Sequence, residues 1–140
     1  MEPSRPLLEV CVESVAGLAA AVSGGADRIE LCAALAIGGL TPAASLVSAA
    51  LRQPLPVHLL ARPREGDFSY SPAEQALVAD DIRLAAEAGL AGVVIGASGP
   101  DRQLDVNVLA AWIGHAHELG AERGRPLSLT LHRAFDLVPD

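Results

Sequence analysis

Short apolar segments alternate with longer Ala- and Leu-rich segments along this 140-residue chain, and the alternation predicts an α/β fold with a parallel sheet. Hydrophobic residues make up 51% of the chain and aromatic residues only 3%, a composition typical of buried strands covered by Ala-rich helices. Polar residues recur at even spacing inside the strands, as in a barrel with a polar lumen. We therefore expect a TIM-like (β/α)8 barrel, of which the chain holds about the first five strands.

The first strand–helix unit begins with a strand over residues 7–12. Ser14 follows as the N-cap of an Ala-, Val- and Leu-rich helix, which stops at the Gly24-Gly25 pair. A second strand over residues 28–32 repeats the unit. Repeated units of this kind form right-handed βαβ crossovers and hence a parallel sheet.

Pairs of a hydroxyl residue and a proline mark the starts of the next two helices. Thr41-Pro42 is expected to supply the N-cap and first residue of a helix over residues 43–51. After a strand over residues 57–62, Ser71-Pro72 supplies the same signal for a helix that runs to Gly89.

The last two expected strands cover residues 92–96 and 127–132, with a helix over residues 106–119 between them. A closed barrel normally takes about 250 residues, so five strands in this length fit the first part of one. A doubly wound open sheet of five strands also fits the count. The polar residues inside the strands favour the barrel, because buried strands of an open parallel sheet are normally apolar throughout.

Four of these strands each carry two polar residues that are two or four positions apart. Side chains at even spacing point to the same face of a strand, so all four strands send polar groups to one side of the sheet. The pairs are Glu9 with Cys11, Glu30 with Cys32, His58 with Arg62, and Thr130 with His132. Four of these residues fall at the carboxyl ends of strands, where barrels have their functional sites: Cys11, Cys32, Arg62 and His132.

The repeated Glu-x-Cys sequence at Cys11 and Cys32 indicates a metal site. It places two sulfur atoms at the ends of strands that would be neighbours, about 4.8 Å apart. Two thiolates that close can hold a soft ion such as Cu(I). The alternative is that both cysteines behave as small buried hydrophobic residues.

The polar residues Glu9, Glu30, Arg62 and His132 are candidate catalytic groups. Carboxylates in a barrel act as acids or bases, or are held by an arginine such as Arg62 or Arg28. His132 is a candidate metal ligand or general acid/base, which Asp136 would orient, and is equally a candidate structural residue.

Arg62 and Arg64 together could bind a carboxylate or phosphate in a bidentate manner. The alternative is that Arg64 is a solvated loop charge and only Arg62 points inward.

The net charge of −7 argues against a nucleic-acid partner, because that affinity depends on clustered Lys and Arg. The apolar runs are shorter than the roughly 20 residues of a membrane-spanning helix, and the start of the chain lacks the pattern of a signal peptide. We expect a cytoplasmic protein with no membrane partner.

Six short segments together resemble the CutC family, in the family's order and spacing. They occupy residues 25–32 (GADRIELC), 38–42 (GGLTP), 62–64 (RPR), 66–68 (GDF), 70–71 (YS) and 132–136 (HRAFD). The resemblance covers essentially the whole chain but only the N-terminal part of a family member. It implies a single CutC-like domain over residues 1–140, truncated at its C-terminal side.

The resemblance further implies a cytosolic protein of copper homeostasis that binds copper ion, with Cys11 and Cys32 at the positions of the proposed ligands. The chain departs from the family at three positions. Ile37 stands where members often have Glu, Glu65 replaces a usual glycine, and Ser69 lies where a relative can carry Cys, which leaves one fewer sulfur ligand.

Two functions therefore compete for this sequence. The first is a copper-handling protein with Cu(I) as its cofactor, and it depends on the cysteines. The second is a TIM-barrel enzyme whose Glu, Arg and His residues act on a small anionic metabolite as small-molecule ligand, an idea that rests on fold analogy. An incomplete gene product is a third possibility, and because a five-strand fragment has open sheet edges, we expect a homo-oligomer.

Overall fold

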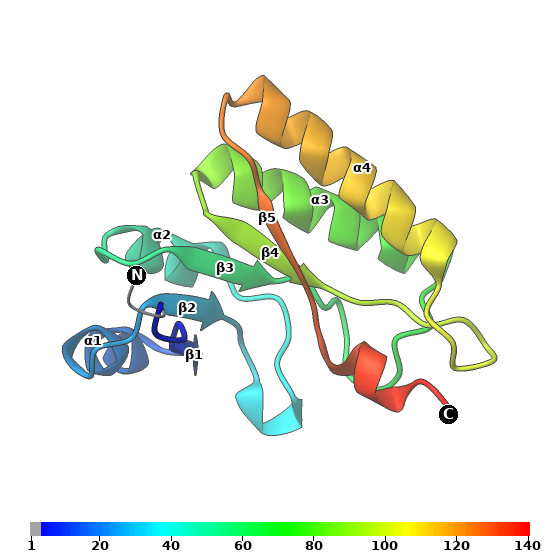
Figure 1. Cartoon of the computed structure of the whole chain (residues 1–140), viewed down its shortest axis with the longest axis horizontal. Coiled ribbons are helices and arrows are strands. Elements are labelled where there is room, and N and C mark those ends of the chain that lie inside the picture. Colours follow the sequence, from blue (N-terminus) through cyan, green and yellow to red (C-terminus); the bar gives the residue numbers. More distant parts are fainter. Residues whose placement is uncertain (1–3) are drawn as a thin grey trace.

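The structure is a computed structural model that describes residues 4–140. Its centre is one parallel sheet with the strand order β1-β2-β3-β4-β5, so each strand lies beside its neighbour in sequence (Figure 1). The strands are β1 (Glu9–Val12), β2 (Arg28–Leu31), β3 (Val57–Leu60), β4 (Gly92–Ile95) and β5 (Ser128–Leu131). The predicted parallel α/β fold is therefore confirmed, and all five strands lie within the ranges that the sequence predicts.

Four helices connect the strands, and two short 3-10 helices follow β2 and β5. They are α1 (Val15–Ser23), η1 (Leu35–Ile37), α2 (Ala44–Leu51), α3 (Pro72–Ala88), α4 (Val106–Glu122) and η2 (Arg133–Leu137). Helices α3 and α4 lie side by side against β4 and β5 (Figure 1). The helix α4 extends three residues beyond the predicted end at Leu119.

Two of the predicted helix caps are confirmed. The Ser14 side chain accepts a hydrogen bond from the backbone N–H of Gly17 at the start of α1. Ser71 and Glu74 form a reciprocal capping box at the start of α3, and Gly89 ends this helix in the left-handed region with a φ of 88°.

The predicted cap at Thr41-Pro42 is wrong. Helix α2 begins at Ala44, and its N-cap is Ala43, which has no capping side chain. The Thr41 hydroxyl instead accepts a hydrogen bond from the backbone N–H of Arg62 at 3.0 Å and lies 2.9 Å from a carboxylate oxygen of Asp81. Thr41 therefore links the segment after β3 to α3. In this position its hydroxyl satisfies the backbone N–H of Arg62, as partly buried backbone groups require.

The two faces of the sheet are chemically different. Between the sheet and the helices, the strand residues Ile29, Leu31, Leu59 and Val93 are fully buried in the main apolar core. The opposite face carries only a small apolar cluster of Cys32, Leu60 and Val94, surrounded by polar strand residues. This division explains why the strands alternate polar and apolar residues.

Both outer strands have an unpaired edge within residues 4–140, because β1 pairs only with β2 and β5 pairs only with β4. Exposed apolar side chains lie next to these edges, at Leu8 before β1 and at Leu131 and Phe135 in and after β5. Self-association through these edges stays a prediction. None of the helices described has the length and apolar character needed to cross a membrane.

Candidate functional site

Strand register brings the predicted polar residues onto one face of the sheet. Glu30 pairs with His58 across β2 and β3, and His58 pairs with Gly92 of β4. A Cβ atom at Gly92 would lie 2.9 Å from the His58 ring, which shows that His58 leans over the polar face. The even-spacing argument for a shared polar face is thus confirmed.

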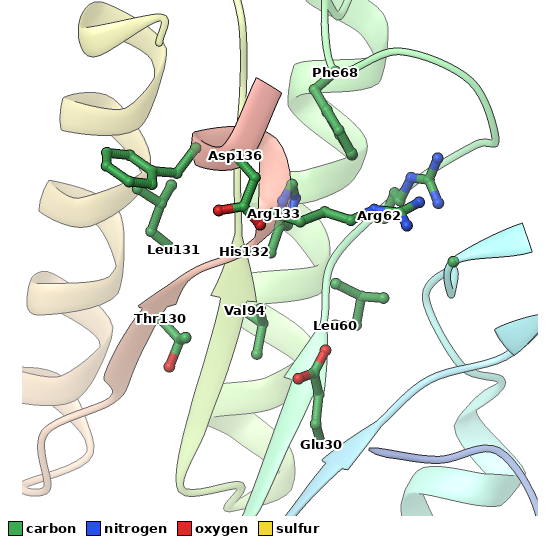
Figure 2. A pocket seen from close by; sticks show the side chains of 12 residues that line it. Glu30, Leu60, Arg62, Phe68, Val94, Thr130, Leu131, His132, Arg133 and Asp136 are labelled. Atoms are coloured by element: carbon green, nitrogen blue, oxygen red, sulfur yellow. The ribbon is translucent and has the colours of Figure 1, made fainter. Parts of the chain in front are cut away.

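A cavity of about 570 Å³ lies over the carboxyl ends of β2 to β5, and we call it the site cavity (Figure 2). This volume falls in the range of about 300–1,000 Å³ typical of small-molecule sites. Its lining combines polar groups from three strands with the residues of η2. The lining residues are Glu30, Gly38, Leu60, Arg62, Phe68, Val94, Thr130, Leu131, His132, Arg133, Phe135 and Asp136.

Arg62 is a buried cation, with only 3% of its surface exposed. Its guanidinium group donates hydrogen bonds to the backbone carbonyl oxygens of Ile37 (3.0 Å), Gly39 (3.0 Å) and Gly66 (2.9 Å). It also lies 5.1 Å from the centroid of the Phe68 ring. Arg62 therefore points inward as predicted, and it holds the loops after β2 and β3 together.

Arg64 does not join Arg62 in the site cavity. Its side chain bonds to the carboxylates of Glu74 and Asp67 and to the carbonyl oxygen of Ser69, and it lies 5.1 Å from the Tyr70 ring centroid. The expectation that Arg64 joins Arg62 in binding an anion is therefore wrong, and of the two arginines only Arg62 lines the site cavity. Arg64 stays in its loop as the alternative predicts, but carboxylates and carbonyl oxygens bind it there in place of solvent.

His132 lies at the end of β5 and projects across β4. A Cβ atom at Gly96 would overlap its ring, and the ring centroid lies 4.7 Å from that of Phe68. Burial, followed by the charges of Arg62 and Arg133, lowers the pKa of His132 to about 4. The imidazole is therefore neutral at neutral pH.

The tautomer of His132 follows from a backbone contact. Its Nδ1 atom accepts a hydrogen bond from the N–H of Ala134 at 3.1 Å, so the proton of the neutral ring is on Nε2. That Nε2 atom is buried and has no partner within residues 4–140. The expectation that Asp136 orients His132 is wrong. The N–H of Ala134, in the turn into η2, occupies Nδ1, and Nε2 has no partner among residues 4–140.

The two glutamates of the polar face differ in their partners. Arg28 donates a hydrogen bond to the Glu9 carboxylate at 2.5 Å, so Glu9 is held in an ion pair. Glu30 lies in the site cavity and has no arginine partner within the described chain. Its pKa is raised, first by burial and then by the nearby charge of Glu9.

The two cysteines are free thiols outside the lining of the site cavity. Cys11 is exposed and lies directly opposite Glu30 in the register of β1 and β2, with its sulfur 3.8 Å from the Glu30 carboxylate. Cys32 is buried, and its sulfur lies 3.7 Å from the carbonyl oxygen of Val12. The described residues contain no group of three or more His, Cys, Asp or Glu side chains arranged to hold a metal ion.

Both thiols resist deprotonation. Burial first, and the charges of Glu30 and Glu9 next, raise the pKa of Cys11. Burial, followed by the charges of Cys11, Glu30 and Glu13, raises the pKa of Cys32 to about 11. A soft metal ion would therefore have to displace a proton from each sulfur.

The main residue that sequence reasoning missed is Arg133. It lines the site cavity, and its guanidinium group packs against Gly38 on the opposite loop. The sequence does contain a signal for Arg133, because it directly follows His132 in a loop at the carboxyl end of a strand, where barrels have their functional sites.

The model of the CutC family matches residues 6–140. The chain belongs to the CutC family. Among curated relatives, a CutC protein of Sinorhizobium medicae is 55% identical over 98% of this chain and 53% of its own length, and one of Caulobacter vibrioides is 49% identical over 100% of this chain and 54% of its own. This chain therefore spans about half the length of the CutC relatives it matches.

Solved structures show the same fold, and one of them is a CutC structure. The structure of CutC from Streptococcus agalactiae, assigned as a copper homeostasis protein, matches with a TM-score of 0.83 and 28% identity, over 95% of this chain and 61% of that one. A protein of Burkholderia cenocepacia assigned as a phosphonomutase matches with a TM-score of 0.62 at 24% identity, over 90% of this chain and 53% of that one, and shows only a shared fold. The predicted membership of the CutC family is confirmed, as is the fold class.

Proposed function

We propose that this CutC chain takes part in copper homeostasis in the cytoplasm and binds Cu(I) through Cys11 and Cys32. The observation that carries the proposal is the placement of two free thiols at the polar face of the sheet, one in β1 and one directly after the neighbouring parallel strand β2. The solved CutC of Streptococcus agalactiae, assigned to copper homeostasis, supports the cellular role.

Copper binding at this place requires a rearrangement of side chains. Cys11 is in register with Glu30, so Cys32 lies two residues further along the neighbouring strand. Strand spacing and rise put such a diagonal pair of Cα atoms about 8 Å apart. Two sulfurs on one metal ion lie within about 4.6 Å, since a metal–sulfur bond is about 2.3 Å long. Cys11 therefore has to leave the Glu30 carboxylate and turn toward Cys32.

A Cu(I) competition titration with a chromophoric chelator under anaerobic conditions tests this proposal. We expect one ion to bind per chain, and Cys11→Ser or Cys32→Ser to weaken binding by more than about 100-fold, since even outer-shell partners of a metal are worth about 10–100-fold. Affinity should rise with pH because both thiol pKa values are raised.

Glu30→Gln is the matched control, because it removes the carboxylate beside Cys11 and keeps both sulfurs. Binding should be retained in this variant. Weak Cu(I) binding by the unmodified chain, or equal binding by the folded serine variants, would contradict the proposal that these cysteines bind copper.

A second candidate is an enzyme that acts on a small anionic metabolite in the site cavity. The observation that favours it is Glu30, a carboxyl with a raised pKa and no ion-pair partner in the described chain, which faces a cavity of suitable size. His132 would act as a neutral hydrogen-bond donor through Nε2. Arg62 would position loops and ligand, whereas Glu9, held by Arg28, would contribute only its charge.

Glu30→Gln also tests this candidate, through activity and stability. Among small hydroxy acids and sugar phosphates followed by proton NMR, at least one should be converted by the unmodified chain, and the conversion should be lost in Glu30→Gln. No conversion, or conversion that survives the substitution, would contradict the enzyme hypothesis.

The stability readout does not depend on the substrate. With its raised pKa, the folded Glu30 contributes stability below its ordinary pKa and loses it as the pH rises through the raised value. Urea unfolding should therefore find Glu30→Gln more stable than the unmodified chain at pH 7, with the difference disappearing at low pH. Glu65→Gln, at an exposed loop position, is the control and should change stability by less than about 0.5 kcal/mol at either pH.

A further inference from the structure

Two arginines from opposite sides of the site cavity meet at one turn of the chain. Arg62, at the end of β3, donates to the carbonyl oxygens of Ile37 and Gly39. Arg133, at the start of η2, packs its guanidinium group against Gly38, which lies between those two residues. Both guanidinium groups therefore contact the same three-residue turn, and Figure 2 shows both side chains directed to this part of the cavity.

Neither positive charge is neutralised within the described chain. No carboxylate lies within ion-pair distance of Arg62 or Arg133 in residues 4–140, and Arg133 makes no hydrogen bond there. Asp136 lines the cavity but does not come within ion-pair distance of either arginine. A buried arginine without a counter-ion is energetically costly, and a second cation beside it adds repulsion.

The positive charge of the two arginines affects the pKa of the neighbouring His132. Arg62 and Arg133 both help to lower the pKa of His132, after burial. The two guanidinium groups thus act on a common region of the site cavity, in which an anion would be favoured.

The other end of the site cavity has different chemistry. Glu30 and Thr130 line it from β2 and β5. Figure 2 shows the apolar side chain of Val94 between these two residues and that of Leu60 between Glu30 and Arg62. A carboxyl with a raised pKa and a hydroxyl group can each donate and accept hydrogen bonds, so this end suits a neutral hydroxyl or carbonyl group.

We propose that Arg62 and Arg133 form an oxyanion subsite, which binds the phosphate or carboxylate group of a small hydroxylated molecule whose hydroxyl end contacts Glu30 and Thr130. The arginine fork binds either anion in a bidentate manner, so the shared chemistry is an oxyanion on a short hydroxylated carbon chain. The inference rests on the enzyme hypothesis only for the idea that the cavity takes a ligand, and it requires neither copper nor turnover.

Isothermal titration of the 140-residue chain at constant ionic strength tests the subsite. The probes are glycerol 3-phosphate, glycerate, inorganic phosphate and glycerol. We expect glycerol 3-phosphate or glycerate to bind more tightly than inorganic phosphate, and glycerol not to bind measurably. Which of the two hydroxylated anions binds more tightly identifies the anionic group.

Substitutions then assign the binding to the proposed residues. Arg133→Gln should weaken the better probe by about tenfold or more, since charge-assisted hydrogen bonds are among the stronger ones in proteins, and Arg133→Lys should bind at an intermediate level. Arg52→Gln removes the same charge at an exposed position at the end of α2 and should bind as the unmodified chain does. Glu30→Gln should weaken glycerol 3-phosphate but not inorganic phosphate.

Absence of saturable anion binding, or equal affinity in Arg133→Gln and Arg52→Gln, would overturn the subsite. Because Arg133 makes no hydrogen bond within the described chain, its variants should fold, which urea unfolding checks. If an anion binds as expected and no compound is converted, the subsite stands and the enzyme hypothesis fails. If a compound is converted while Arg133→Gln binds it normally, the subsite fails and the enzyme hypothesis stands.

Discussion

Replacing Gly96 by alanine should lower the free energy of unfolding by about 1–3 kcal/mol and displace His132 from the site cavity. Gly96 follows β4, and a Cβ atom there would overlap the His132 ring. The ring has little freedom to retreat, because its Nδ1 atom is bound by Ala134 and its face packs near Phe68. Urea unfolding measures the loss of stability, and the NMR resonances of the His132 ring report its displacement.

Two further variants separate this overlap from a general effect of alanine. Gly114→Ala, at an exposed position in α4 with no atom within 4 Å of the added Cβ, should stabilise the chain by about 0.5–1 kcal/mol, because glycine is unfavourable inside a helix. Combining Gly96→Ala with His132→Ala should cost less than the sum of the two single changes, since the ring is then absent. Additive costs would show that Gly96 acts independently of His132.

The polar face of the sheet was predictable because it depends on a strict local rule. Side chains alternate along a strand, so residues such as Glu30 and Cys32 had to share a face wherever the strand ended. The apolar residues between them, such as Leu31, had to face the helices, where Leu31 is fully buried. Strand order followed as well, since successive strand–helix units normally lie side by side.

Features set by distant contacts were not predictable in this way. The stagger between β1 and β2, which places Cys11 opposite Glu30, depends on how the whole sheet twists and coils. Thr41 has the local signal of a helix cap, yet its hydroxyl bonds to the backbone of Arg62, 21 residues away in sequence. Local propensity is overridden there by a tertiary contact.

The arginines illustrate the same limit within the site. Arg62 and Arg64 are two positions apart, which predicts a shared direction only while the strand continues. The strand β3 ends at Leu60, and the loop after it turns Arg64 toward Glu74 on α3. The second cation of the site cavity, Arg133, instead comes from the chain 71 residues further on, because η2 folds back over the ends of the strands.

Replacing Arg62 by methionine should lower the free energy of unfolding by about 1–3 kcal/mol. Methionine keeps much of the apolar stem but removes the donors to the carbonyl oxygens of Ile37, Gly39 and Gly66. The bond to Gly39 is buried and those to Ile37 and Gly66 are partly buried, so leaving these oxygens unpaired carries a desolvation cost. Net stabilities of single domains are about 5–15 kcal/mol, so the variant should unfold at a much lower urea concentration.

The matched comparison is Arg133→Met, which removes the same charge from the other side of the site cavity. Arg133 is exposed and donates no hydrogen bond within residues 4–140, so its loss should change stability by less than about 0.5 kcal/mol while weakening anion binding. This contrast separates two roles: Arg62 supports the loops in addition to its proposed place in the subsite, whereas Arg133 acts only on the ligand. Equal destabilisation by the two substitutions would mean that the carbonyl contacts of Arg62 contribute little to stability.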